Sequence, residues 1–270
     1  FEGSIEEEMV FPYPSLPADE RENLEMLLDS VRKFAAARID ARAIDEAEHL
    51  PVELLAGMGE LGLFGLTIPE EYGGFGFSMA AYGRVMSELA TICGATAATI
   101  GAHLGIGCKG ILLFGTEEQK KRFLPACASG ETISAFCLTE PSSGSDAAHI
   151  VARGELDAAS GIWTINGTKQ WITNGGFAGV FTVFAQTEAG KKEKAMSAFL
   201  ISRATEGLAT GLPEKKMFGG VSFMLQGNMA CGVLKDEMLV RIDPGQHDAA
   251  VGKPHVRTFE QRGRLMEGWI

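Results

Sequence analysis

The chain lacks the cysteine pattern of a disulfide framework or a zinc site. Its five cysteines form no CxxC pair and their number is odd, whereas both kinds of site need paired, regularly spaced cysteines. No uninterrupted apolar run approaches the roughly 18 residues that suggest a membrane span. We therefore expect no metal site, no membrane span and a reducing compartment, the cytoplasm.

Positive charge is scarce as well. The formal net charge is −11 at pH 7, and a phosphate-backbone partner requires basic patches, so a nucleic-acid partner is not expected. The charge is unevenly distributed. Residues 216–270 contain seven Lys and Arg and six Asp and Glu, whereas residues 1–215 contain 17 Lys and Arg and 29 Asp and Glu. This change in composition predicts a domain boundary there.

The first position holds Phe1 rather than Met, without a signal-like basic segment. We therefore expect the sequence to begin inside a longer reading frame. Its 270 residues, 46% of them hydrophobic, are enough for a sizeable core.

Residues 1–130 have the pattern of a helical domain. Apolar residues recur at helical spacing in four stretches, 17–45, 51–62, 78–103 and 117–128. Thr116 and Gln119 predict a capping box before the last of these helices, and Gly130 predicts its end.

The pattern then changes to that of a β domain over residues 131–212, which we expect to be antiparallel. Strand-like stretches cover 132–138, 161–173, 180–186 and 195–201. Beyond residue 212, shorter strands over 221–225, 229–234 and 238–242 and a helix near 246–251 predict a small, incomplete α/β module over 213–270. The predicted fold class is α+β.

Two segments of the β domain carry candidate chemistry. The strand Ser134–Leu138 breaks at Pro141 into a loop of hydroxyls and Gly144, which offers backbone and side-chain donors at one place. Further along, Trp171 and Thr173 stand two residues apart, which would place them on one face of a strand. Such donors suit an anion or the pyrimidine edge of a flavin.

Together these segments resemble the flavin-binding elements of the acyl-CoA dehydrogenase family. The resemblance covers residues 1–216 and is closest to the very-long-chain type. It rests on residues 101–103, 109–120 and 135–148 as well as on 171–176. It implies an N-terminal helical domain, a middle β domain and α,β-dehydrogenation of a long-chain fatty acyl-CoA by FAD, with electron-transfer flavoprotein as acceptor and a homo-oligomeric enzyme.

The resemblance also implies site residues. The strand and loop Phe136–Ser145 lie against the isoalloxazine, and Thr139 and the backbone beside Leu138 form hydrogen bonds to its pyrimidine end. Ser145 reaches the pyrophosphate or the acyl-CoA substrate. The remaining cofactor-binding residues are Trp171, Ile172 and Thr173, of which the threonine approaches flavin N5. Donors at these places stabilise the charge that develops on reduced flavin.

No catalytic base is expected in this chain. In the family the glutamate that removes the α-proton belongs to a C-terminal helical bundle, and that bundle is absent here. From Lys216 onward the sequence resembles the N-terminal domain of TfoX-type competence regulators instead, through 216–220, 227–233 and 263–269. Both resemblances share the Lys-Lys-Met segment, so we expect a fusion, a recombination product or an assembly error.

Plainer interpretations stand beside these. The Thr139–Ser145 loop could be an ordinary surface turn, and Trp171 a core aromatic. Glu140, beside a proline at a strand end, fits a structural acceptor or a solvated group better than a general base. His103 fits a satisfied packing histidine, and Cys137 inert packing.

Three hypotheses follow. The first is an acyl-CoA dehydrogenase without its catalytic domain, inactive alone and poor at retaining FAD. The second is a non-enzymatic regulatory or interaction protein acting through its TfoX-like module. The third is an unstable fragment with exposed apolar helix faces near Leu61–Leu66 and Ala90–Ile106.

Overall fold

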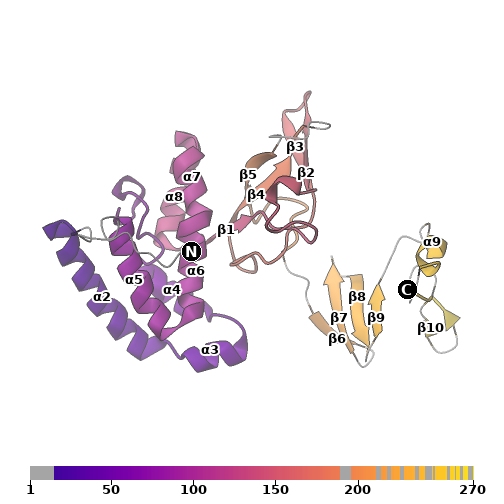
Figure 1. Ribbon diagram of the computed structural model, residues 1–270, viewed down its shortest axis with the longest axis horizontal. Helices are drawn as coiled ribbons and strands as arrows, with labels where there is room; N and C mark the ends of the chain where they lie inside the picture. Colours follow the sequence, from indigo (N-terminus) through magenta and orange to yellow (C-terminus); the bar gives the residue numbers. More distant parts are fainter. Residues whose placement is uncertain are drawn as a thin grey trace, which may run out of the picture. The chain divides into compact units, whose positions relative to one another are not determined.

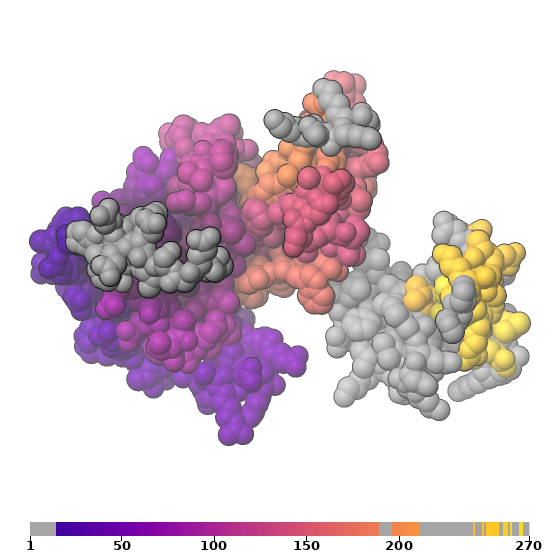
Figure 2. All heavy atoms as spheres, in the orientation of Figure 1, coloured from indigo at the N-terminus to yellow at the C-terminus, as the bar shows by residue number. Residues whose placement is uncertain are grey.

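The computed structural model describes residues 15–188 and 196–210, and shorter stretches between 214 and 270 that include 214–217, 220–225, 228–234, 237–240 and 247–253 (Figure 2). The chain divides into two compact units, Phe1–Glu206 and Gly207–Ile270. The first unit contains both the helices and the larger sheet, and the second is described by itself.

The first unit begins with helices that match the predicted pattern and divide it more finely (Figure 1). They are α2 (Ala18–Arg38), α3 (Ala41–Ala47), α4 (Val52–Glu60), η1 (Glu70–Tyr72), α5 (Met79–Ile92), α6 (Gly94–Gly101), the π-helix η2 (Ala102–Cys108), α7 (Lys109–Phe114) and α8 (Glu117–Ser129). The predicted helix 17–45 breaks because Ile39 is extended and the Asp40 side chain caps α3. The predicted helix 78–103 breaks at the extended Cys93.

Both ends of α8 confirm the prediction from sequence. Thr116 accepts a hydrogen bond from the Gln119 N–H, and the Gln119 side chain accepts one from the Thr116 N–H, which completes the capping box. At the other end Gly130 takes a left-handed φ of 79°. A side chain is disfavoured there by its backbone conformation, so the helix stops.

The helices enclose one apolar core. Helix α2 packs against α5, and α5 packs against α6. Leu63, Phe64 and Leu66 are fully buried in this core, so the expectation of an exposed apolar face near Leu61–Leu66 is wrong. The turn that follows α4 folds these side chains inward instead of leaving them on a helix surface.

One continuous helical stretch, Gly94–Phe114, is long and apolar enough to cross a membrane by length and composition alone, with 21 residues and a mean hydropathy of 1.5. It is not an uninterrupted apolar run, because glycines, threonines, His103 and Lys109 lie within it. In this fold it contributes Ile100, Leu104 and Cys108 to the buried core, while Ile106, Leu113 and Phe114 are exposed.

A five-stranded sheet completes the first unit. Its strands are β1 (Ser134–Cys137), β2 (Arg153–Asp157), β3 (Ile162–Asn166), β4 (Val180–Gln186) and β5 (Met196–Ser202). On one edge, β4 pairs with β5 along its whole length. On the other edge it pairs first with β1 and then, at Gln186, with Arg153 of β2. Strand β1 also packs against the π-helix η2, which joins the sheet to the helices.

The sheet is mixed, whereas the sequence predicted an antiparallel one. The β2–β3 hairpin and the β4–β5 pair are antiparallel, but β1 and β4 run parallel, with Ser134 opposite Val180. A parallel pair needs a long crossover. The chain supplies it between Cys137 and Val180, where it forms the loop after β1 and the β2–β3 hairpin.

The β2–β3 hairpin also corrects the predicted strand 161–173. Strand β3 ends at Asn166, and β2, a charged and mostly exposed strand, was not predicted. The turn between them is built from Asp157, whose carboxylate accepts hydrogen bonds from the Ala159 N–H and the Ser160 hydroxyl, and Gly161, at a φ of 72°. An aspartate four residues before a glycine was the signal for this turn.

The second unit contains an antiparallel sheet of four strands in sequence order. They are β6 (Glu214–Met217), β7 (Gly220–Leu225), β8 (Asn228–Leu234) and β9 (Glu237–Val240). The three predicted strands are confirmed, and β6 is an addition. The helix α9 (His247–Val251) follows, then a hairpin of β10 (Glu260–Gln261) and β11 (Arg264–Leu265). Ile270 pairs with Val240 through both backbone groups.

Candidate functional site

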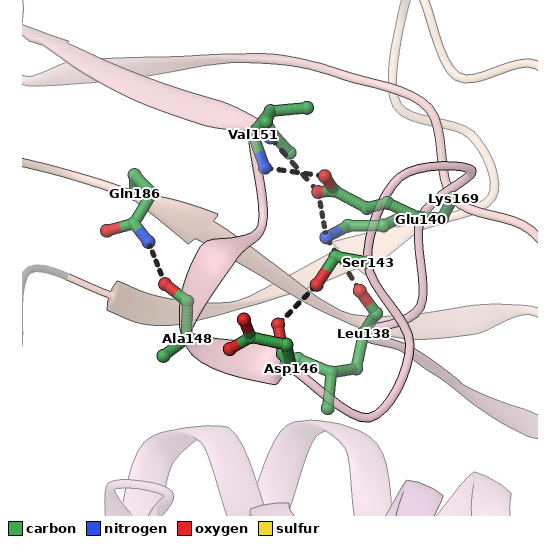
Figure 3. A network of polar contacts seen from close by, with 9 residues as sticks. Leu138, Glu140, Ser143, Asp146, Ala148, Val151, Lys169 and Gln186 are labelled. Carbon is green, nitrogen blue, oxygen red and sulfur yellow. Dashed lines mark hydrogen bonds and ion pairs between the residues drawn. The ribbon is translucent and has the colours of Figure 1, made fainter.

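The first predicted loop is organised around a buried carboxylate. The Glu140 side chain is fully buried, and its oxygens accept hydrogen bonds from the backbone N–H groups of Val151, at 2.5 Å, and Ala152, at 3.0 Å. Figure 3 shows this carboxylate between the Val151 backbone and the Lys169 ammonium. The glutamate therefore closes the loop that leaves β1 onto the segment that enters β2.

Lys169 completes the network. Its Nζ lies 2.7 Å from Glu140 Oε1 and donates a second hydrogen bond, of 3.1 Å, to the Leu138 carbonyl (Figure 3). A buried charge is tolerated when it is paired and its remaining groups are hydrogen-bonded. The Lys169 ammonium therefore binds both the Leu138 carbonyl and the Glu140 carboxylate of the first loop. Lys169 lies two residues before Trp171.

Burial raises the pKa of the Glu140 carboxyl, but the hydrogen bonds from Lys169, Val151 and Ala152 outweigh it, so the pKa lies below its usual range. At neutral pH this carboxylate is therefore ionised, and both of its oxygens accept hydrogen bonds. The structure thus confirms Glu140 as a structural acceptor, and its burial leaves no path to a substrate proton.

The two segments that are predicted to bind the flavin are joined directly. The Gln170 N–H donates a 3.0 Å hydrogen bond to the Thr139 carbonyl. Leu138 is bound through its carbonyl to Lys169. Two segments about thirty residues apart in sequence therefore lie side by side. Thr139 is hydrogen-bonded to Gln170, the residue directly before Trp171.

The second segment is a turn and not the end of a strand, so the predicted strand face shared by Trp171 and Thr173 is wrong. Residues 173–177 are in turns, with the Gly175 N–H bonded to the Ile172 carbonyl at 2.9 Å. Trp171 and Asn174 take left-handed φ values of 57° and 67°. The bonds of Lys169 and Gln170 to the first loop draw this segment away from the β ladder.

Trp171 is not a core aromatic. Its side chain is 84% exposed, which removes the plainer interpretation of this tryptophan. A bulky residue at positive φ is uncommon and marks either strain or a functional constraint. Phe136, by contrast, packs on Phe184 of β4, with ring centroids 4.8 Å apart.

The predicted site residues share one property, which is that none of them is buried. Phe136, Leu138, Thr139 and Ile172 are half-buried, and Ser145, Trp171 and Thr173 are exposed. These hydroxyls, backbone groups and two aromatics lie at the end of β1 and on two loops joined by a hydrogen bond. Such a set fits the donor and stacking requirements of a flavin. The residues present therefore suit FAD.

The rest of the first loop is held by short-range bonds. Glu140 and Ser143 exchange backbone hydrogen bonds, and the Ser143 hydroxyl donates to the Asp146 carbonyl. Asp146 precedes the short helix η3 (Ala147–His149) and forms an exposed ion pair with His149, whose Nδ1 lies 2.6 Å from the carboxylate. The ion pair raises the pKa of His149 above 6.5.

His103 is a packing histidine, as the sequence predicted. It is fully buried, its Nδ1 accepts a hydrogen bond from the Ser134 N–H at 2.9 Å, and its Nε2 lies within 3.2 Å of two backbone carbonyls. Cys137 is buried and burial raises the pKa of its thiol to about 11, which suits inert packing. Within the described part of the chain, no group of three metal-ligating side chains occurs.

A shallow hollow of about 290 Å³ lies elsewhere, on the helices. Its lining comprises Asp19, Glu20, Asn23, Glu70, Phe75, Gly76, Phe77 and Ser78. None of the predicted site residues lines this hollow.

Two residues that shape the site were not predicted from the sequence. Lys169 pairs with Glu140 across 29 positions, and no spacing rule links a lysine in a predicted strand to a glutamate in a loop. The second is Asn174, which is buried. Its side chain donates to the Thr99 carbonyl at 3.0 Å and to the Ser134 carbonyl at 3.4 Å.

The first unit is a helical region joined to a mixed sheet, with two accessible loops tied together by hydrogen bonds. Comparison with known proteins identifies both parts. The acyl-CoA dehydrogenase N-terminal domain matches residues 21–131, and the acyl-CoA dehydrogenase middle domain matches residues 135–229. The chain belongs to the acyl-CoA dehydrogenase family. The TfoX N-terminal domain matches residues 207–269 and overlaps the second match.

Individual relatives support this assignment. A very long-chain specific acyl-CoA dehydrogenase, mitochondrial, from Macaca fascicularis is 44% identical over 223 residues, which are 80% of this chain and 34% of the relative. The chain thus spans about a third of the length of the very long-chain relatives that it matches.

Solved structures share the fold. Butyryl-CoA dehydrogenase from Megasphaera elsdenii superposes with a TM-score of 0.66 at 29% identity, over 80% of this chain and 59% of that one. An acyl-CoA dehydrogenase complexed with FAD from Bacillus anthracis gives 0.62 at 38% identity, over 72% and 33%.

Proposed function

We propose that residues 1–206 form the flavin-binding part of an FAD-dependent acyl-CoA dehydrogenase that acts on long-chain fatty acyl-CoA. The observation that carries this proposal is the hydrogen bond from the Gln170 N–H to the Thr139 carbonyl. It brings together the two segments that are predicted to bind the flavin, and both segments are accessible. The identity with very long-chain relatives supports the substrate class.

The proposed roles follow from residue type and place. Thr139 and the backbone at Leu138 bind the pyrimidine edge of the flavin, beside Phe136, and Ser145 binds the pyrophosphate or the acyl-CoA. Trp171 and Ile172 shield the ring from water, and the Thr173 hydroxyl donates toward N5. When bound, FAD accepts the hydride equivalent removed from the substrate.

We also propose that residues 1–270 by themselves turn over no acyl-CoA. The family resemblance places the proton-abstracting glutamate in a C-terminal helical domain, beyond the matched domains. Glu140 cannot replace it, because its carboxylate is buried and fully hydrogen-bonded. We also expect weak FAD retention, because in this proposal the flavin contacts come from the end of β1 and two exposed loops alone.

A flavin titration tests this function. The purified chain is expected to carry little flavin, and added FAD is expected to give a saturable change in the visible spectrum. Trp171→Phe should weaken that change, whereas Trp163→Phe is the matched control, because Trp163 lies on β3 against Phe199. The absence of saturable binding would refute the flavin site. Bleaching of bound flavin by acyl-CoA would refute the proposed inactivity.

The wider context is also proposed. We propose an N-terminal helical domain over 1–130, a middle β domain over 131–212 and a TfoX-like module over 213–270. The acceptor is an electron-transfer flavoprotein, as the family resemblance implies, and the family is homo-oligomeric. We propose a cytoplasmic location, which is supported by the free, buried thiols of Cys93, Cys108, Cys127 and Cys137.

A second function is favoured by one observation. The TfoX N-terminal match over 207–269 coincides with the separate compact unit Gly207–Ile270. We infer that this unit acts as a non-enzymatic regulatory or interaction module. Comparing the full chain with a chain ending at Glu206 tests this proposal. A partner bound by the first and lost from the second supports it, and equal binding by both contradicts it.

A further inference from the structure

The turn that carries Trp171 is strained and cannot be held by the tryptophan itself. A left-handed φ of 57° at a tryptophan costs free energy and persists when the surroundings impose it. The Trp171 side chain is 84% exposed. It therefore makes few contacts that could impose this conformation, and the constraint must come from its neighbours.

Asn174 is the neighbour that reaches into the protein. It is 6% exposed, and its Nδ2 donates to two carbonyls that belong to different parts of the fold, Thr99 in α6 and Ser134 in β1. One side-chain amide thus ties the turn to the helices and to the strand that leads to Leu138 and Thr139.

The acceptors are themselves fixed. The Ser134 N–H and hydroxyl bond to His103, which is buried in the π-helix η2. The Asn174 backbone also serves the turn, because its carbonyl accepts the N–H groups of Phe177, at 3.1 Å, and Ala178, at 2.8 Å. The asparagine therefore connects helix and strand positions to Phe177 and Ala178, which follow it in the chain.

A second group holds the far end of the turn. The Arg203 guanidinium donates to the Gly175 carbonyl at 2.8 Å and to the Ala178 carbonyl at 2.5 Å. It also lies over the Phe181 ring, 5.4 Å from the centroid. Arg203 therefore fixes Gly175–Ala178. The Trp171–Thr173 end lies between the bonds of Lys169 and Gln170 to the first loop on one side and the buried Asn174 on the other.

We propose that Asn174 is a positioning residue for flavin binding: its buried amide holds Trp171 and Thr173 in place beside the loop of Thr139. This inference rests on the proposed flavin site but concerns a residue that would not contact the flavin. Its basis is the geometry of one side chain that joins α6, β1 and the turn.

Two substitutions separate the amide from the backbone conformation. Asn174→Asp keeps the size and the tolerance of positive φ but turns an acceptor toward the Thr99 and Ser134 carbonyls. Asn174→Gly keeps the positive φ and removes the side chain. Asn166→Asp is the matched control, because Asn166 is an exposed asparagine at the end of β3. Replacing Trp163 and Trp269 by Phe leaves Trp171 as the single tryptophan.

Two readouts decide the inference, the dissociation constant for FAD and the fluorescence anisotropy of Trp171 without FAD. We expect both Asn174 variants to weaken FAD binding at least tenfold and to lower the anisotropy, with Asn166→Asp unchanged. A role confined to stability would lower the melting temperature and leave both readouts as in the parent. That result, or parental binding by Asn174→Gly, would overturn the inference.

The two proposals can fail separately. If the parent chain binds no FAD, the flavin site fails, while the anisotropy of Trp171 still reports whether Asn174 holds the turn. If the parent binds FAD and both Asn174 variants bind it equally well, the positioning role fails and the flavin site stands. Should Asn174→Asp not fold, Asn174→Gly decides.

Discussion

Glu140 Oε1 and Lys169 Nζ lie 2.7 Å apart in the interior of the β domain, and the side chains are 0% and 10% exposed. The pair is notable for what it joins. Glu140 closes the loop after β1, and Lys169 precedes the turn of Trp171. One ion pair therefore fixes the distance between the two segments that are predicted to bind the flavin. Most of the testable consequences of this fold concern that loop or the turns that pack beside it.

Removing the charge of Glu140 should destabilise the protein. Glu140→Gln leaves a buried ammonium with a neutral partner, and breaking a buried ion pair costs roughly 3–5 kcal/mol. We expect a loss near the lower end of this range, since an amide oxygen can still accept one bond. Chemical denaturation gives the free energy of unfolding.

The control for that experiment is Glu155→Gln, the same change at an exposed position of β2. It should alter the free energy of unfolding by less than about 0.5 kcal/mol. Equal effects of the two substitutions would show that the Glu140–Lys169 pair contributes no stability.

The same carboxylate should make stability depend on acid. The pKa of Glu140 is lowered from 4.5 in the folded state, so its contribution is complete above the unfolded pKa and is lost as pH falls through the folded one. Below pH 4.5 the free energy of unfolding should therefore fall more steeply for the parent than for Glu140→Gln. Parallel curves from pH 6 to pH 3 would contradict the assignment.

Two glycines of the helical region should respond in opposite ways to alanine. A Cβ on Gly74 would lie 2.0 Å from the Ile68 carbonyl oxygen, whereas a Cβ on Gly83 meets nothing within 4 Å. Gly83 lies inside α5, where alanine is favoured over glycine by about 1 kcal/mol. Thermal unfolding should show a lower melting temperature for Gly74→Ala and a higher one for Gly83→Ala.

The exposed pair of Asp146 and His149 offers a local test of the loop. Asp146 raises the pKa of His149 above 6.5, so its stabilising effect is present at pH 6 and is lost as pH rises through the folded pKa. An NMR titration should show the pKa of His149 falling toward 6.5 in Asp146→Asn. His149→Asn identifies the resonance. An unchanged pKa would show that the ion pair does not form in solution.

Local signals in the sequence predicted the helices and several strands well. The capping box of Thr116 and Gln119 and the stop at Gly130 depend on neighbouring residues, so they are readable in one dimension. The prediction failed where distant groups compete with the local pattern. Trp171 lies in a turn because Lys169 and Gln170 bond to the first loop, and no period along the chain records those bonds.

The sequence by itself determined the fold class, the family and the residue types that suit a flavin, because periodicity, caps and long motifs are local properties of the chain. Tertiary structure alone decided that β1 and β4 run parallel, that Glu140 is a buried partner of Lys169, and that Asn174 ties the turn to α6 and β1. These features depend on contacts between residues far apart in sequence. Their free energies come from burial and pairing, which exist only once the chain has folded.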